Sequence, residues 1–152
     1  MPPVLRAALA YAAERPNEVT AAVGRHLALC GAALGIGLLL ALPAGIVSAR
    51  RRGLAEAIIG AFNGLRVVPS LAILFLAVPL LGIGFRPALV ALVALACPPM
   101  LLATHAALRG VPAPVREAAY GLGMSPVQVL ARVDLPLAGP VMLSGLRTAV
   151  VE

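Results

Sequence analysis

Three long stretches of the chain contain no charged residue, and their length limits what the chain can fold into. They run from Leu27 to Ala49, from Val67 to Phe85 and from Pro87 to Thr104. A helix that rises 1.5 Å per residue needs about 20 residues to cross a hydrocarbon core about 30 Å thick. Hydrophobic residues make up 61% of the chain and charged residues 12%, whereas a soluble domain is usually about half apolar and about a quarter charged. We therefore predict an all-α, polytopic membrane protein.

The arginine residues indicate which loops face the cytoplasm. One cluster, 50–52, follows the first apolar stretch, and a second cluster (Arg109, Arg116 and Arg132) follows the third. Because basic residues hold loops on the cytoplasmic side of a membrane, we expect both clusters there. This arrangement predicts spans at about 27–49, 65–85 and 87–105, with the N-terminus outside. Pro69 is expected to bend or start the main part of the second span.

The two ends of the chain differ from these spans. Residues 1–25, interrupted at Pro16, are polar enough to form an extracytoplasmic or interfacial segment, and residues 26–152 would form the transmembrane domain. The start of a fourth span is predicted from about residue 138, and we expect the given sequence to end inside it. Small residues there would allow close packing against another helix; they are Ala138, Gly139, Ser144 and Gly145.

Several classes of function are disfavoured by the residue content. The net charge of +6 would suit a nucleic acid partner, but the chain has few aromatic side chains on which bases could stack. Cys30 and Cys97 have no metal-ligand spacing, and His26 and His105 are isolated. The sequence contains neither a GxxxxGK[ST] phosphate loop nor a Ser-His-Asp set. We therefore predict no catalytic residue, no metal, no cofactor and no nucleic acid partner.

A compact polar insert at 109–136 separates the third apolar stretch from the fourth. Prolines at its start suit the first turn of a helix, and Gly123 suits the left-handed position that ends one. Ser125 can cap a second helix, with Pro126 at its first position, and Pro136 is expected to stop that helix. The insert is therefore expected to be a docking element for another protein or a solvated connector, and the residues alone favour neither.

The insert resembles the EAA signature of bacterial ABC-importer permeases, which is Glu-Ala-Ala, three residues, Gly, nine residues, Ile, any residue and Leu-Pro. The one departure is Val133 in place of Ile. Segments such as "HLALCGAALGIGLLLALPAGIVSARRR" and "LRVVPSLAILFLAVPLLGIGFRPALVAL" are similar to the osmoprotectant branch, the glycine betaine, carnitine and choline permeases. Another departure is Ala103-Thr104, where that branch usually has Asn-Thr. The matching positions are Glu117, Ala118, Ala119, Gly123, Val133, Leu135 and Pro136.

This resemblance implies a type I ABC-importer permease-like bundle in the bacterial inner membrane, with no enzymatic activity of its own. The implied partners are an ATP-binding subunit, a second permease copy or paralogue, an extracytoplasmic substrate-binding protein and the lipid bilayer. The implied substrate is a small osmoprotectant such as glycine betaine, choline or carnitine. By the same resemblance, the surface that couples to the ATPase would comprise Arg116, Glu117, Ala118, Ala119, Gly121, Gly123, Val133, Leu135 and Pro136.

The path of the substrate is harder to assign from the sequence. Polar candidates in or near the spans are Asn63, Ser70 and Thr104. The glycines of the first span (Gly31, Gly35 and Gly37) are more often used for helix packing. Two other interpretations stay open: a permease for another small solute, such as an amino acid or another cation, and a membrane scaffold protein that binds a partner without transport.

Overall fold

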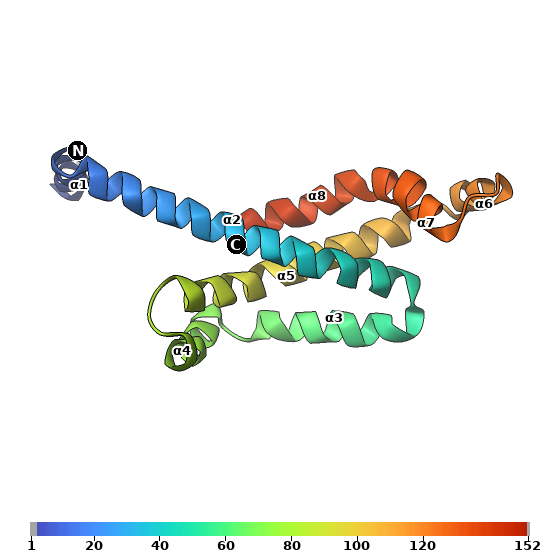
Figure 1. Ribbon diagram of the computed structural model, residues 1–152, viewed down its shortest axis with the longest axis horizontal. Helices are drawn as coiled ribbons and strands as arrows, with labels where there is room; N and C mark the ends of the chain where they lie inside the picture. The colour runs from blue at the N-terminus through green and yellow to red at the C-terminus, as the bar shows by residue number, and fades with distance from the viewer. Residues whose placement is uncertain (1–2, 152) are drawn as a thin grey trace.

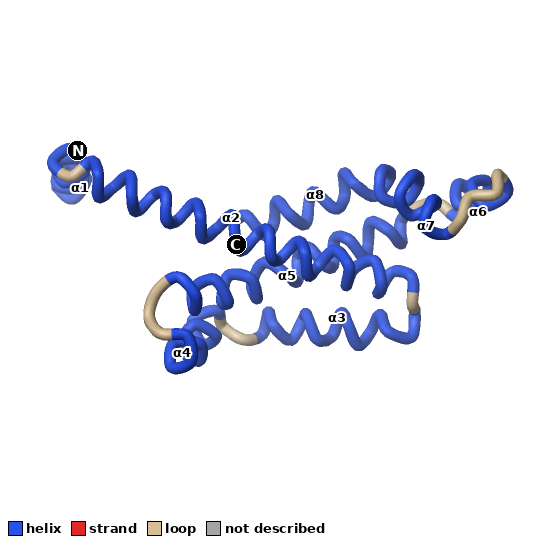
Figure 2. The backbone as a smooth tube through the Cα atoms, in the orientation of Figure 1, coloured by secondary structure: helices blue, strands red, loops and turns tan. Residues whose placement is uncertain are grey.

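The computed structural model describes residues 3–151, and these residues form helices joined by short connections (Figures 1 and 2). This confirms the predicted all-α class. Met1, Pro2 and Glu152, which belong to the outer ends of the two predicted regions, lie outside the described residues. The helices are α1 (Pro3–Glu14), α2 (Pro16–Arg50), α3 (Arg52–Val67), α4 (Ser70–Leu81), α5 (Phe85–Gly110), α6 (Ala113–Gly121), α7 (Pro126–Val129), the π-helical turn η1 (Leu130–Asp134) and α8 (Leu135–Val151).

Helix α5 is the centre of the bundle, and α2, α3, α4 and α8 all pack against it (Figure 1). Its middle turns, from Ala96 to Leu101, are buried. Four side chains form one of the core clusters around it. Helices on several sides bury these turns, and the rest of the third apolar stretch would face lipid, so a membrane helix of this kind needs no polar face. The cluster consists of Ala41, Ala96, Met100 and Leu101.

Small residues allow α2 and α8 to lie close to α5. The buried face of α2 consists of Ala33, Gly37, Ala41, Gly45 and Ser48, which recur every third or fourth residue. A Cβ atom placed on Gly45 would lie 2.6 Å from the Cβ atom of Thr104. Position 45 therefore requires a glycine, because any side chain there would overlap the side chain of Thr104.

The glycine expectations hold in part. Gly37 packs against Ala96 and Met100 of α5, as expected of a packing glycine. A Cβ atom added to Gly31 or Gly35 would instead have nothing within 4 Å, so helix packing within this chain does not explain these two glycines. On α8, Ala138 and Gly145 are buried, and Gly145 lies against the backbone of α5.

The second predicted span, 65–85, differs from the structure. Its residues are divided between α3 and α4, which meet at an angle of 89°. The proline at position 69 explains the break, because its ring disfavours helical conformation in the residue before it. Val68 is accordingly extended, with φ −80° and ψ 119°, and Pro69 directly precedes the first residue of α4. The prediction that Pro69 bends or starts the main part of this helix is confirmed, since Pro69 lies at the break and directly precedes α4.

The helix after the polar insert also differs from expectation. Pro136 does not end it, because α7, η1 and α8 run on as one helix from Pro126 to Val151. The π-helical turn directly precedes Pro136, and the Leu135 amide donates to the Leu130 carbonyl. A π-turn widens the helix locally, which accommodates a proline ring that would otherwise collide with a carbonyl one turn earlier.

Within residues 3–151, three helices are long and apolar enough to cross a membrane: α2, α5 and the helix from Pro126 to Val151. The bent pair of α3 and α4 would be a fourth if it is counted as one span. The predicted spans at 27–49 and 87–105 lie within α2 and α5. Because α2 already begins at Pro16, the predicted segment 1–25 is shared between α1 and the start of α2.

The close contact at Gly145 generates a stability prediction. In Gly145→Ala, the added Cβ would lie 2.8 Å from the Pro99 carbonyl oxygen, and overpacking of this kind costs about 1–3 kcal/mol. Gly139→Ala on the same helix is the matched control, because nothing lies within 4 Å of its Cβ position. Thermal unfolding in detergent should show a lower midpoint for Gly145→Ala and an unchanged or higher midpoint for Gly139→Ala. Equal midpoints would contradict the close packing of α8 on α5.

Candidate functional site

Helix α6 lies at the end of the bundle that is remote from the N-terminus (Figure 1), and its two boundaries are set by local sequence. Val111 and Pro112 are extended, so α5 and α6 are separate helices. At the other end, Gly123 has φ +80°, its amide donates to the Tyr120 carbonyl, and the Met124 amide donates to the Ala119 carbonyl. This pair of bonds is a Schellman motif. It confirms the prediction that Gly123 has a left-handed conformation, which residues other than glycine adopt only with strain.

The next helix begins with a capping box. The Gln128 amide donates to the Ser125 hydroxyl at 3.4 Å, and the Ser125 amide donates to the Gln128 side-chain oxygen at 2.8 Å. Pro126 occupies the first turn, as predicted. These contacts satisfy amides that a helix start leaves without partners. The turn between α6 and α7 is therefore defined by its own sequence from both sides.

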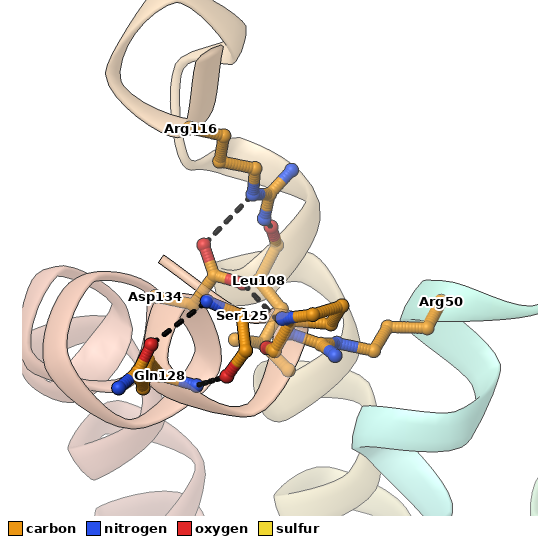
Figure 3. A network of polar contacts seen from close by, with 7 residues as sticks. Arg50, Leu108, Arg116, Ser125, Gln128 and Asp134 are labelled. Atoms are coloured by element: carbon orange, nitrogen blue, oxygen red, sulfur yellow. Dashed lines mark hydrogen bonds and ion pairs between the residues drawn. The ribbon is translucent and has the colours of Figure 1, made fainter. Parts of the chain in front are cut away.

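A buried carboxylate, Asp134, connects the polar insert to the membrane helices (Figure 3). One oxygen accepts from the Arg116 Nε at 2.7 Å, and the other accepts from an Arg50 Nη at 3.3 Å. Asp134 is 3% exposed. A carboxylate removed from water to this degree is costly unless it is paired and hydrogen-bonded, and both of its oxygens are paired here.

The two arginines extend this network to further elements. The same Arg50 nitrogen donates to the Pro126 carbonyl at 3.3 Å, and an Arg116 Nη donates to the carbonyl of Leu108, near the end of α5 (Figure 3). The network therefore joins α2, α5, α6, α7 and η1 around one side chain. Removal of one partner from a buried ion pair typically costs about 3–5 kcal/mol. The arginine side chains here are 35% and 30% exposed, so solvent screening places the cost below that range.

The predicted coupling residues do not share one surface. Glu117, Ala118 and Gly121 are exposed on α6, and their spacing of three and four residues places them on one face. Arg116 and Ala119 lie on the opposite face, where Arg116 binds Asp134 and Ala119 is 5% exposed. This differs from the prediction that both belong to the contact surface.

The remaining motif residues lie after α6. Gly123 ends the helix, and Val133 and Leu135 are half-buried in the helix from Pro126 to Val151. Pro136 is exposed in that helix. We name the outer surface of α6 by the exposed residues of the face that carries Glu117, together with the adjoining Leu122, whose side chain is 83% exposed. Tyr120, which is 47% exposed, instead borders the pocket that Arg50, Arg116 and Asp134 line. The outer surface of α6 comprises Glu117, Ala118, Gly121 and Leu122.

The polar candidates for a substrate path are not brought together. Thr104 is buried, donates to the Met100 carbonyl of its own helix at 2.8 Å, and borders an apolar cavity of about 580 Å³. The residues that line this cavity come from α2, α5 and α8. Asn63 is exposed on α3 and Ser70 is half-buried at the start of α4, so neither lines it.

Sequence reasoning misses Asp134 and Arg50 as site residues, although the sequence carries a signal for one of them. Asp134 lies between Val133 and Leu135, at a position where the EAA signature allows any residue, so the motif does not identify it as a site residue. It is nevertheless the single acidic residue between Glu117 and Glu152, in a segment that turns apolar. A lone carboxylate there requires a cationic partner. The partner itself lies 84 positions away in the sequence, at Arg50.

Comparison with known proteins agrees with this architecture. Residues 41–152 match the family described as binding-protein-dependent transport system inner membrane component. The chain belongs to this family. It is therefore a multi-pass component of the inner membrane, and the family is one of transport proteins rather than enzymes.

Individual relatives are similar over most of the chain. The choline transport system permease protein OpuBB of Bacillus subtilis is 40% identical over 126 residues, which are 83% of this chain and 58% of the relative. The osmoprotectant import permease protein OsmY of Salmonella typhimurium is 44% identical over 127 residues, 82% of this chain and 54% of the relative. The glycine betaine/carnitine/choline transport system permease protein OpuCB of B. subtilis is 36% identical over 135 residues, 89% of this chain and 62% of the relative. The chain thus spans less than two thirds of the length of these relatives.

Proposed function

We propose that this chain forms part of the membrane permease subunit of an ATP-driven importer for a small osmoprotectant such as glycine betaine, choline or carnitine. The observation that carries the proposal is the outer surface of α6. It presents the exposed part of the EAA signature, Glu117 and Ala118, beside the large apolar side chain of Leu122. A helix held out at the end of a bundle with such a surface is suited to binding another protein.

The partner at this surface would be a separate ATP-binding subunit. The sequence has no phosphate loop, so the energy for transport would be supplied from outside the chain. Ala118 and Gly121 give α6 a face without bulk, on which a partner can approach the backbone closely, and Glu117 adds a charge for orientation. A second permease copy or paralogue and an extracytoplasmic substrate-binding protein would complete the importer.

The substrate class rests on the relatives, whose names specify choline, glycine betaine, carnitine or osmoprotectant transport. Quaternary ammonium groups are typically bound in aromatic cages. The five aromatic residues of this chain (two Tyr and three Phe) are scattered along its sequence, so we do not expect them to form such a cage within one copy. Selection of the substrate is therefore assigned to the binding protein rather than to this chain.

The distribution of charges supports a proposal for the orientation of the chain in the membrane. Arg50, Arg51 and Arg52 lie at the end of α2 that contacts the polar insert, and the insert itself carries Arg116 and Arg132. Basic residues favour the cytoplasmic side, so the insert would face the cytoplasm and the N-terminus the outside. In a cysteine-free background, a membrane-impermeant maleimide should label the exposed position in Ala13→Cys in intact cells and leave Ala131→Cys unlabelled until the cells are opened. The reverse pattern would contradict this orientation.

Docking on α6 can be tested with a matched pair of substitutions. Ala118→Arg places a long charged side chain on the outer surface of α6, whereas Ala131→Arg places it on an exposed position of the neighbouring helix. Both should leave the bundle folded. With the complete permease expressed beside its ATP-binding subunit, Ala118→Arg should reduce co-purification of that subunit by about tenfold or more, as expected for the loss of a central interface contact. Ala131→Arg should reduce it little.

Uptake by the same complexes distinguishes the function from its alternatives. The wild-type complex in vesicles, supplied with ATP and the binding protein, should accumulate choline, glycine betaine or carnitine, and Ala118→Arg should not. Accumulation of only amino acids or other cations would contradict the substrate class. Recovery of a partner without ATPase activity, together with no uptake of any solute, would favour a scaffold protein and contradict the importer.

A further inference from the structure

We propose that Asp134, held by Arg50 and Arg116, is a positioning residue that locks α6 to the membrane helices, so that a displacement of α6 moves the ends of α2 and α5. The proposal rests on the proposed function, because it concerns how movement of the partner bound at α6 reaches the bundle. We name the three side chains the Asp134 lock.

Apart from this lock, α6 is joined to the bundle in few places. The elements that it packs against are α7 and η1, with Ala119 and Val129 as buried side chains on the two sides. The connection at its start is the extended pair of Val111 and Pro112, and the connection at its end is the Schellman turn at Gly123. Because Val111 and Pro112 are extended, the helical hydrogen bonds do not continue from α5 into α6, so the backbone alone does not join the two helices as one rigid rod.

The lock bridges both of these connections. Arg116 projects from α6, bonds to Asp134 across the α6–α7 turn, and bonds to the Leu108 carbonyl across the α5–α6 turn (Figure 3). Arg50 then ties the same carboxylate to the end of α2 and to the first residue of α7. With the lock intact, α6 cannot rotate about either connection without breaking the Arg116–Asp134 ion pair or the hydrogen bond from Arg116 to the Leu108 carbonyl.

The lock has one carboxylate for two guanidinium groups, and each oxygen of Asp134 serves a different arginine. This arrangement explains why an amide would not replace it. In Asp134→Asn, one oxygen remains as an acceptor and the other position becomes an NH₂ donor that faces an arginine. One of the two contacts, with Arg50 or with Arg116, must then be lost, while the shape and volume of the side chain at position 134 are kept.

The test uses the complete permease with its ATP-binding subunit and binding protein, reconstituted in liposomes. It measures ATP hydrolysis and substrate uptake in the same samples. Asp134→Asn should still co-purify with the ATP-binding subunit, because the outer surface of α6 is untouched, and should still hydrolyse ATP. The ratio of substrate taken up to ATP hydrolysed should fall by about fivefold or more, within the range by which single residues change coupling between sites. Loss of folded protein alone would lower both activities together and leave this ratio unchanged.

Two further variants complete the design. Arg132→Gln removes an exposed charge from the same π-helical turn and should keep the wild-type ratio. The triple variant Arg50→Leu, Arg116→Leu and Asp134→Leu removes the lock without leaving a buried unpaired charge, which such apolar replacements tolerate. We expect it to assemble and to be uncoupled like Asp134→Asn.

Three results would overturn the proposal. They are a wild-type ratio in Asp134→Asn, a wild-type ratio in the triple variant, and failure of both to assemble while Arg132→Gln assembles normally, which would mean that the network is structural only. Failure of the proposed function would appear differently, as absence of uptake or of ATPase binding in the wild-type complex itself.

Discussion

The arrangement of the polar insert on the membrane helices depends on one interaction, the pairing of the buried Asp134 carboxylate with Arg50 and Arg116. Asp134 is 3% exposed and would be costly if it stood alone, so its position requires that Arg50 and Arg116 reach it. Those two side chains come from distant parts of the sequence and from different helices. Their pairing therefore determines how the end of α2, the end of α5 and the polar insert sit together. A partner bound to α6 would thus act on helices of the membrane domain and not on a loose loop.

The membrane part is organised by a different constraint, the close approach of helices to α5. Small residues on α2 and α8 permit that approach, most clearly at Gly45 and Gly145, where an added Cβ would meet atoms of α5. In lipid there is no hydrophobic driving force between helices, so contacts of this kind supply much of the specificity of helix packing.

Pro69 and Pro136 show that the structural effect of a proline depends on its surroundings. The first separates α3 from α4, and the second is tolerated beside a π-turn.

The sequence predicts more of the polar insert than of the membrane path. Gly123 and Ser125 carry local signals, because a left-handed turn and a capping box depend on a few adjacent residues, and both predictions are confirmed. The break at Val68 is predicted as a bend or a helix start at Pro69, but its angle is not predicted, since α4 packs against α5 and local sequence does not specify that contact. The inward direction of Arg116 cannot be predicted, because its partner belongs to another helix and the motif does not specify that position.

The translocation candidates illustrate a further limit. Asn63, Ser70 and Thr104 are candidates because they are polar, but polarity along a sequence does not state which helix face a residue occupies. In the structure Thr104 borders a cavity that the other two do not line. Its hydroxyl is also satisfied by its own helix. Small residues, by contrast, predict packing correctly wherever a second helix lies opposite them, as at Gly37, and fail at Gly31 and Gly35, where none does.

The docking role of α6 is tested most simply by site-specific photo-crosslinking in native membranes that contain the complete permease. A photoreactive amino acid at position 118, on the outer surface of α6, is compared with the same residue at position 75, where Phe75 is exposed on α4. We expect an adduct with an ATP-binding subunit from position 118 and none from position 75. An adduct from position 75, or its absence at position 118 in membranes that carry out ATP-driven uptake, would contradict the assignment of α6 as the surface that receives the driving subunit.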